Sequence, residues 1–517
     1  MLKRLLPLLA LVPTLSLAAP AGGTTTTYNS TGTILLDGTK IFPIVLSKGP
    51  PRDGTTPLGA DALNETIAAG VNFFKVGPAT TLWTSADIED ARLWDAATAA
   101  RGRYTWINLS TLSQAQPGSS THQLLHQVIT TLRSDPGSPG IGMWKGADEP
   151  WWTGIPVSSL QFAYCLSTSR GSSSWCANYA PLDADHLWVT IQAPRGTSSD
   201  LAPYSAVTDV HGSDAYPINV NVANPDLHQV GLWTNTIASI TRSHAVWTTL
   251  QICSSGSYNA SGFVLPTRAQ ERYMIYDAII NGARALGFYG GNNPNCWTAS
   301  DTAYGWNWTF WNNVLKGLIE EINAASPIHP ALVNAESNEA VPTNDSSTQA
   351  ISRAGNAGDR WIIAAGSGSG TKAVTISGLP AGTTTGIVYT EGRSVAVSNG
   401  SFTDNFGPWD VHVYRFAGTP PTAVAVSDFA ARRVKRAVIL SWRTTAETGM
   451  VSFNLYRLGG GGTARLNRRP IPAHAGATGS GVRYRFVDRS SGRSRLYRLQ
   501  VVALDGSRRW GGSARIS

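Results

Sequence analysis

Hydrophobic residues between positions 41 and 325 fall into short β-rich runs that alternate with longer segments of helical spacing. The runs predict eight strands, at residues 41–46, 71–76, 104–109, 140–145, 187–192, 206–211, 245–252 and 285–289. The intervening segments predict helices, at residues 59–69, 85–101, 120–134, 228–242, 266–282 and 306–324. Eight strands that alternate with helices over about 250–300 residues are typical of a closed (β/α)8 barrel, the TIM barrel. The alternative is a doubly wound open sheet, which the absence of a glycine-rich phosphate loop after the first strand disfavours.

The pattern changes beyond residue 330, where short alternating strands are separated by Gly and Pro. Strands at 361–365, 373–376, 386–389, 394–397 and 411–416 predict a small β-sandwich over residues 328–417. After a stiff linker at 418–421, strands at 438–442, 453–457, 484–487 and 496–503 predict a second sandwich over residues 422–517. In Trp442 and the run Asn454-Leu455-Tyr456-Arg457, this module resembles fibronectin type III domains. The predicted fold class is therefore α/β, with a TIM barrel over residues 28–327 followed by two small all-β sandwich domains.

The first 21 residues have the features of a secretory signal peptide. Lys3 and Arg4 precede an apolar run at 5–17 and small residues at 18, 19 and 21. No later stretch is apolar for about 20 residues, so we expect no membrane span. The sequence therefore predicts a secreted or extracellular protein, with attachment to a cell surface as a variant of this location.

Four cysteines fit an oxidising compartment, and their spacing alone leaves three pairings open. Cys253 and Cys296 follow strands seven and eight, which are neighbours in a closed barrel, so a bridge between them is geometrically plausible. Cys165 and Cys176 would then join the segment after strand four.

The net charge of +8 is unevenly distributed along the chain. Residues 420–517 contain 18 Lys+Arg and 4 Asp+Glu, a net charge of +14, and the remaining chain has a net charge of −6. The charge favours a solvated arginine-rich face in this C-terminal module, and the alternative is a module that binds an anionic polymer or a cell surface. No nucleic-acid recognition motif is visible, so we expect no nucleic acid partner. We expect the protein to be a monomer.

Composition limits the chemistry further. Eighteen Trp in one chain favour an aromatic groove for a ligand such as a sugar. Neither the nine His nor the four Cys show metal-ligand spacing, so we expect no metal and no cofactor. No Gly-x-Ser-x-Gly elbow supports serine-based acyl transfer.

The end of predicted strand four carries the strongest chemical signal. Asp148 and Glu149 are adjacent carboxylates, preceded by Trp144 and followed by Pro150 and Trp151. Reactive groups of a (β/α)8 barrel lie at the C-terminal ends of its strands, and a Trp-lined pocket raises a carboxyl pKa as a general acid requires. The alternative is a structural loop in which Asp148 caps the next helix and Glu149 pairs with an Arg.

Other strand ends add polar and aromatic groups at the same rim. Asp214 and Tyr216 follow strand six, and Tyr289 and Asn292 lie at the end of strand eight. Strand seven ends at Gln251, whose amide cannot form a glycosyl ester.

With these motifs, residues 33–416 resemble glycoside hydrolases of the (β/α)8 clan that carry an acid/base Glu after strand four. The resemblance implies that Glu149 is the general acid/base and that Asp148 and Asp214 are candidate partners. It implies a sugar site lined by Trp144, Trp151, Tyr216, Gln251, Tyr289 and Asn292. Retaining members carry a nucleophilic Glu at the end of strand seven, where this chain has Gln251.

Three interpretations of this departure stay open. Asp214 supplies the second carboxylate, or Asp148 orients a substrate acetamido group that attacks its own anomeric carbon, or the barrel binds glycan without cleaving it. We therefore predict a secreted glycoside hydrolase with a carbohydrate substrate. The rival is a non-catalytic glycan-binding or adhesion protein on a degenerate barrel.

Overall fold

The computed structural model describes residues 24–134, 140–168, 176–241, 245–253, 264–417, 426–444, 450–459, 462–473, 482–489, 496–503 and 508–516. The predicted signal peptide and the predicted linker at 418–421 lie outside the described residues. The chain divides into two compact units, one of Met1–Arg353, Ile362–Gly382 and Val388–Val413, the other of Ala354–Trp361, Thr383–Ile387 and Tyr414–Ser517. Within the described ranges, no helix has the length and apolar content needed to cross a membrane.

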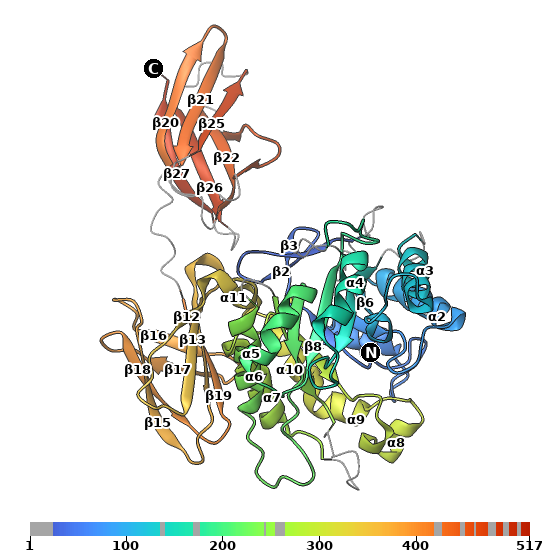
Figure 1. Ribbon diagram of the computed structural model, residues 1–517. Helices are drawn as coiled ribbons and strands as arrows, with labels where there is room; N and C mark the ends of the chain where they lie inside the picture. The colour runs from blue at the N-terminus through green and yellow to red at the C-terminus, as the bar shows by residue number, and fades with distance from the viewer. Residues whose placement is uncertain are drawn as a thin grey trace, which may run out of the picture. The chain divides into compact units, whose positions relative to one another are not determined.

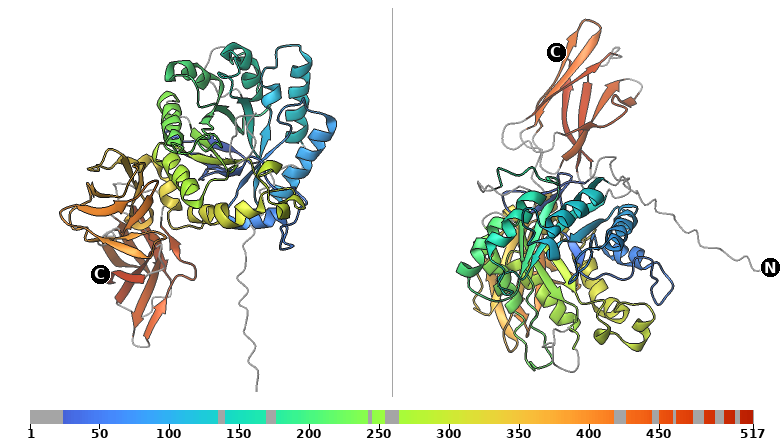
Figure 2. Two further views of the ribbon diagram at one scale, coloured as in Figure 1. Left: turned by 90° about the horizontal axis from the view of Figure 1, so that it is seen from below. Right: turned by 45° about the vertical axis from the view of Figure 1, so that its right-hand side comes forward.

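Eight parallel strands form a closed barrel in the first unit, and helices surround them (Figures 1 and 2). The barrel order is β10-β11-β4-β5-β6-β7-β8-β9. The strands are β4 (Ile44–Leu46), β5 (Phe73–Val76), β6 (Tyr104–Asn108), β7 (Ile141–Asp148), β8 (Leu187–Gln192), β9 (Val210–Ser213), β10 (Ala245–Gln251) and β11 (Ala285–Tyr289). The predicted TIM barrel is confirmed. Strand six begins later than predicted, because Ala202–Val207 forms a 3-10 helix with a proline in its first turn.

The longer helices of this unit differ in how they begin and end. They are α1 (Ala62–Ala69), α2 (Ser85–Ala99), α3 (Ser120–Ser134), α4 (Val157–Ser167), α6 (Gln229–Ile240), α7 (Arg268–Ile280) and α10 (Lys316–Ile322). Thr84 and Thr267 start α2 and α7 with capping boxes, and Gly70 follows α1 with a positive φ of 126°. The sequence pattern missed α4, because seven of its eleven residues are buried and it therefore has no clear polar face.

Large side chains fill the barrel interior. The rings of Trp106 and Trp247 pack at 4.6 Å between centroids, next to Phe73 and Met143. A small sheet of β1 (Thr26–Tyr28), β2 (Ile34–Leu36) and β3 (Thr39–Lys40) packs Ile34 against the same cluster. The barrel is thus a packed core, as expected for this fold, and it leaves the mouth at the C-terminal strand ends as the place for a ligand.

All-β sheets follow the barrel, as predicted. A six-stranded sheet has the order β12 (Glu339–Ala340), β13 (Thr348–Ala354), β14 (Arg360–Gly366), β19 (Val411–Phe416), β16 (Thr385–Val388) and β17 (Arg393–Ala396). A two-stranded sheet pairs β15 (Lys372–Ser377) with β18 (Ser401–Phe406).

The last module contains two antiparallel sheets. One has the order β20 (Val426–Val434), β21 (Ala437–Thr444) and β25 (Arg483–Asp488). The other has the order β23 (Gly462–Arg465), β22 (Met450–Gly459), β26 (Leu496–Ala503) and β27 (Arg508–Arg515), with β24 (Ile471–Pro472) on β22. Trp442 is buried in the core of this module, and its ring stacks on Tyr484 at 5.1 Å between centroids.

Candidate active site

A one-residue bulge at the end of β7 shapes the centre of the barrel mouth. The pairing of β7 with β8 shifts between Lys145 and Asp148, so that three residues of β7 match two of β8. Residues three apart in a regular strand lie on opposite faces, and the bulge lets Lys145 Nζ approach Asp148 Oδ1 to 2.7 Å. Gly146 lies within the bulge, where a Cβ would come within 1.9 Å of Trp188 Nε1. A glycine is therefore required at position 146.

Glu149 sits directly after this strand with an unusual backbone. Its φ is +47°, in the left-handed region that L-residues rarely adopt. Its N–H donates to Ile191 O at 2.7 Å, and its carbonyl accepts from Thr153 N at 3.0 Å, so neighbouring segments fix this conformation. Such strain is concentrated at functional sites, where the surrounding structure imposes it.

The alternative in which Asp148 caps the next helix and Glu149 pairs with an Arg does not agree with the structure. Asp148 pairs with Lys145, and Pro156, which precedes α4, makes no side-chain cap. Glu149 forms no ion pair within the described ranges, although the charge of Arg195 acts on it. Both carboxyl groups are therefore available at the mouth.

Opposing effects separate the pKa values of these two groups. Desolvation would raise the pKa of Asp148, but the charges of Lys145, Lys75 and Lys48 outweigh it, and the pKa is lowered. Desolvation and the negative charge of Asp148 raise the pKa of Glu149. The pKa values of the two neighbouring carboxyl groups are thus shifted apart, the arrangement that separates acid and base roles in catalysis.

Asp214 adds a third carboxyl group from the segment after β9. Its N–H donates to Gln192 O at 3.3 Å, and its side chain hydrogen-bonds with that of Tyr216. Burial, together with the negative charges of Glu149 and Asp148, raises its pKa well above the ordinary value. Its Oδ1 has no hydrogen-bond partner among the residues that the structure describes. Asp214 therefore belongs to the same electrostatic cluster and favours its neutral form.

Two tyrosines form an aromatic wall beside the carboxyl groups. The rings of Tyr216 and Tyr289 stack with centroids 5.9 Å apart and planes 6° apart. Tyr289 is 42% exposed, and Asn292 is exposed on the loop after β11. The structure therefore brings Tyr216 and Tyr289 together at the mouth, and it leaves their edges open to a ligand.

Two predicted lining residues have structural roles instead. Trp144 is fully buried among the residues between barrel and helices, and its Nε1 donates to Asp183 at 2.8 Å. Gln251 is 1% exposed, and its amide both accepts from Ile218 N and donates to Ile218 O, each at 2.8 Å. The prediction that these two side chains contact sugar is corrected. Trp144 faces away from the barrel axis, and backbone groups already occupy the hydrogen-bonding atoms of the Gln251 amide.

The predicted Trp151 is partly buried and packs over Gly196, where a Cβ would lie 3.1 Å from its ring. Its neighbour Trp152, which was not among the predicted lining residues, is 56% exposed and lies 4.9 Å from the Arg195 guanidinium. The lysines of the mouth were not predicted either. A Lys inside an otherwise apolar barrel strand, as at positions 75 and 145, is the signal that would have found them.

Both disulfides form as predicted. Cys253 joins Cys296 with Cα atoms 5.9 Å apart, which ties the loop after β10 to the loop after β11. Cys165 of α4 joins Cys176 with Cα atoms 4.9 Å apart. In the described part of the chain, no group of three or more His, Cys, Asp or Glu side chains is arranged to hold a metal ion.

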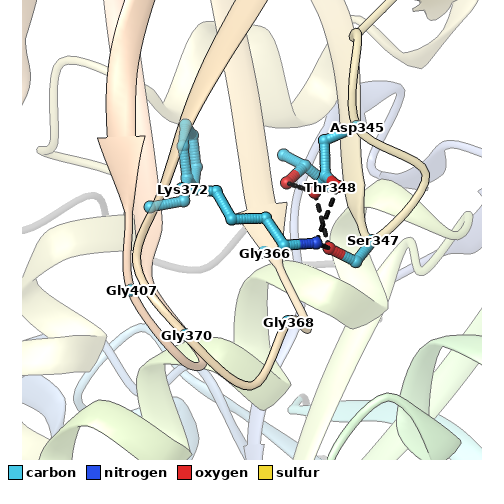
Figure 3. Close-up of a pocket in the computed structure, with 9 residues that line it drawn as sticks. Asp345, Ser347, Thr348, Gly366, Gly368, Gly370, Lys372 and Gly407 are labelled. Atoms are coloured by element: carbon cyan, nitrogen blue, oxygen red, sulfur yellow. Dashed lines mark hydrogen bonds and ion pairs between the residues drawn. The ribbon is translucent and has the colours of Figure 1, made fainter.

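A small hollow lies beside strands β14, β15 and β18 (Figure 3). Asp345 accepts hydrogen bonds there from Lys372 Nζ at 2.8 Å, Ser347 Oγ at 2.5 Å and Thr348 Oγ1 at 2.9 Å. The hydrogen bond from Lys372 is the main reason why the pKa of Asp345 falls to about 2. These polar groups satisfy one another, which makes the cluster a structural turn.

No protein-family model matches the chain, and no curated protein matches it. Among solved structures, it is similar to a glycoside hydrolase with 10% identity and a TM-score of 0.47, over 77% of this chain and 97% of that one. A family 30 endoxylanase from Clostridium papyrosolvens matches with 11% identity and a TM-score of 0.42, over 77% and 98%. A family 5 glycoside hydrolase from Bacteroides vulgatus matches with 10% identity and a TM-score of 0.44, over 78% and 95%. At these TM-scores the likenesses carry no argument, and the barrel assignment rests on the strand pairing above.

Proposed function

We propose that the protein is a secreted glycoside hydrolase that cleaves glycosidic bonds in a poly- or oligosaccharide, with Glu149 as the general acid/base. The observation that carries the proposal is a pair of adjacent carboxyl groups at the barrel mouth, of which Asp148 is paired with Lys145 at 2.7 Å and Glu149 has no ion pair within the described residues. The pKa directions agree with this division, lowered for Asp148 and raised for Glu149. Hydrolysis of a glycosidic bond needs one proton donor and one anionic group. The stacked pair of Tyr216 and Tyr289 supplies an aromatic surface for a pyranose ring.

In this mechanism Glu149 protonates the glycosidic oxygen as its bond to the anomeric carbon breaks. A water molecule then bonds to the anomeric carbon, and the Glu149 carboxylate takes a proton from that water, which restores the acid. Asp148, held ionised by Lys145 at 2.7 Å, stabilises the positive charge that develops on the sugar ring. The raised pKa of Asp214 favours its neutral form, which donates a hydrogen bond to the substrate through Oδ1, the oxygen without a partner among the described residues. Asp148 is thus favoured over Asp214 as the ionised partner, because only the pKa of Asp148 is lowered.

Reducing-sugar release over a panel of neutral and acidic glycans tests the proposal. Glu149→Gln is expected to lower turnover by about 10²- to 10⁴-fold, the usual contribution of a general acid. Glu89→Gln is the matched control, because Glu89 is exposed on α2 and pairs with Arg92 of the same helix. Full activity of Glu149→Gln, with the fold unchanged in circular dichroism, would refute the assignment. A larger loss for Asp214→Asn than for Asp148→Asn would make Asp214 the ionised partner.

The second candidate function is glycan binding without turnover, and Gln251 favours it. Gln251 occupies the end of β10, and Ile218 and Cys253 backbone groups hold its amide. Saturable glycan binding without product release from any substrate of the panel would establish this candidate in place of the hydrolase.

We propose further that the C-terminal module resembles fibronectin type III domains and anchors the protein to an anionic polymer or cell surface. Its net charge of +14 over residues 420–517 supports this role. On one sheet of the module, Arg498 lies 3.9 Å from the ring of Trp510, which is 44% exposed and lies 5.3 Å from Tyr456. Arg465 pairs with Tyr456 across the strands and is exposed. Retention of the full chain on immobilised polygalacturonate, lost at high salt and in Arg498→Gln, tests this role.

A further inference from the structure

Three lysines come from separate segments to the barrel mouth, and the acid/base mechanism uses only one of them. Lys145 of β7 pairs with Asp148. Lys75 of β5 places its Nζ 5.7 Å from the Trp106 ring and 6.0 Å from the Tyr289 ring. Trp106 belongs to the packed barrel interior, so Lys75 lies directly above the core and beside the tyrosine wall. Lys48 follows β4, where Trp306 Nε1 fixes its backbone by donating to Lys48 O at 2.8 Å.

Two of the three lysines at the mouth have no ion-pair partner within the described residues. Within the described residues, neither Lys75 nor Lys48 has a carboxylate within ion-pairing distance, and Asp148 is already paired with Lys145. Burial and the negative charges of Glu149 and Asp148 raise the pKa of Asp214 well above its ordinary value, which makes this carboxyl group a poor counter-ion for the two lysines. A partly buried cation without a counter-ion is costly, and an anionic ligand would remove that cost.

We propose that the sugar bound at this mouth carries an anionic group, a carboxylate or a sulfate ester, and that Lys75 and Lys48 bind it beside the Tyr216–Tyr289 wall. The inference rests on the proposed function, because it names the substrate class of the same site. An acidic sugar fits both features at once, since its ring covers the tyrosines and its charged group reaches the ammonium groups.

The titration of Lys75 gives this site a pH signature. Burial is the main reason why the pKa of Lys75 falls to about 7, and the charges of Lys145 and Lys48 lower it further. Asp148 and Asp214 act in the opposite direction, and a bound anion would add to them. Binding of an acidic sugar therefore includes proton uptake, and its affinity falls above about pH 7 by up to tenfold per pH unit.

The test measures equilibrium binding to the full chain by calorimetry, so that its result does not depend on turnover. The probes are an oligogalacturonate, its carboxyl-reduced neutral form, and a sulfated galactan oligosaccharide. For whichever acidic probe binds, Lys75→Met is expected to weaken binding by about 10- to 100-fold, and Lys75→Arg is expected to retain most of it. Lys316→Met is the matched control, because Lys316 pairs with Glu65 away from the strand ends.

Each result of this experiment has one meaning. Binding of the oligogalacturonate alone identifies a carboxylate sugar, and binding of the sulfated probe alone identifies a sulfate ester. Equal affinity for the acidic and the reduced probe, or unchanged affinity in a folded Lys75→Met variant, would overturn the inference. Tight binding of an acidic probe without hydrolysis would refute the hydrolase and leave the inference standing. Hydrolysis of neutral glycans at the same rate in wild type and in Lys75→Met would support the hydrolase and refute the inference.

Discussion

Replacing Glu271 by Gln is expected to stabilise the barrel in a pH-dependent way. Glu271 lies in α7 with 0% of its surface exposed. Both of its carboxyl oxygens lack a hydrogen-bond partner among the residues that the structure describes. Burial raises its pKa well above the ordinary value, so the folded protein holds this group in its neutral form.

The size of the effect follows from the unfolded chain, where an exposed Glu titrates near pH 4.3. Keeping the group neutral at pH 7 costs up to about 3.7 kcal/mol, at about 1.4 kcal/mol for each pH unit above that value. Because the pKa of Glu271 is raised in the folded state, the folded protein binds more protons at this group than the unfolded chain does. The free energy of unfolding therefore falls as the pH rises above about 4.3, where Glu271 ionises in the unfolded chain. The neutral Gln removes that loss and keeps a side chain of nearly the same shape.

Thermal unfolding of the full chain, followed by calorimetry, is the assay. Glu271→Gln is expected to raise the Tm of the barrel transition by about 5–10 °C at pH 7 and to leave it nearly unchanged at pH 4. Glu320→Gln is the control, because Glu320 is exposed on the neighbouring α10. An equal Tm change at both pH values, or a lower Tm at pH 7, would refute the reasoning, since it would mean that the Glu271 carboxylate has a partner.

Three further predictions concern a buried ion pair, the candidate active site and a disulfide. Arg272 and Glu321 form an ion pair at 2.7 Å. Glu321→Gln leaves the charge of Arg272 unbalanced and is therefore expected to destabilise the barrel by about 3–5 kcal/mol in denaturant unfolding. A loss below about 1 kcal/mol would contradict this expectation. The negative charge of Asp148 raises the pKa of Glu149, and Asp148→Asn removes that charge. The alkaline limb of the pH profile of the residual kcat/KM is therefore expected to move to lower pH. An unchanged limb would argue against Glu149 as the acid. Cys253→Ser opens a bridge of sequence separation 43 and is expected to cost about 4 kcal/mol of unfolding free energy, whereas an unchanged unfolding midpoint would count against the bridge.

Much of the fold could be predicted because the barrel repeats one local pattern. All eight predicted strands overlap the observed ones, from β4 to β11. Each begins or ends where Gly, Pro or polar residues interrupt an apolar run, and such boundaries are local properties of the chain. The pairing of Cys253 with Cys296 also followed, because the closed barrel makes their strands neighbours.

The candidate site was predicted only in part, because strands of a parallel barrel are buried on both faces. Their sequences are almost continuously apolar, so no alternation tells which residues point inward. Trp144 was therefore expected in the ligand site although it faces the helices, and Lys75 was overlooked although it lies at the mouth. Gln251 bonds to Ile218, 33 residues earlier in the chain, and no local pattern indicates such a contact.

The sequence by itself determined that eight strand–helix units close into a barrel and that Asp148 and Glu149 stand at the end of its fourth strand. Only the tertiary structure decided which charges these carboxyl groups experience. A bulge at Gly146 turns Lys145 toward Asp148, and closure of the barrel brings Lys75 to the same mouth. Periodicity is a property of neighbouring residues, whereas a pKa depends on the charges and the burial that the whole fold brings to one point.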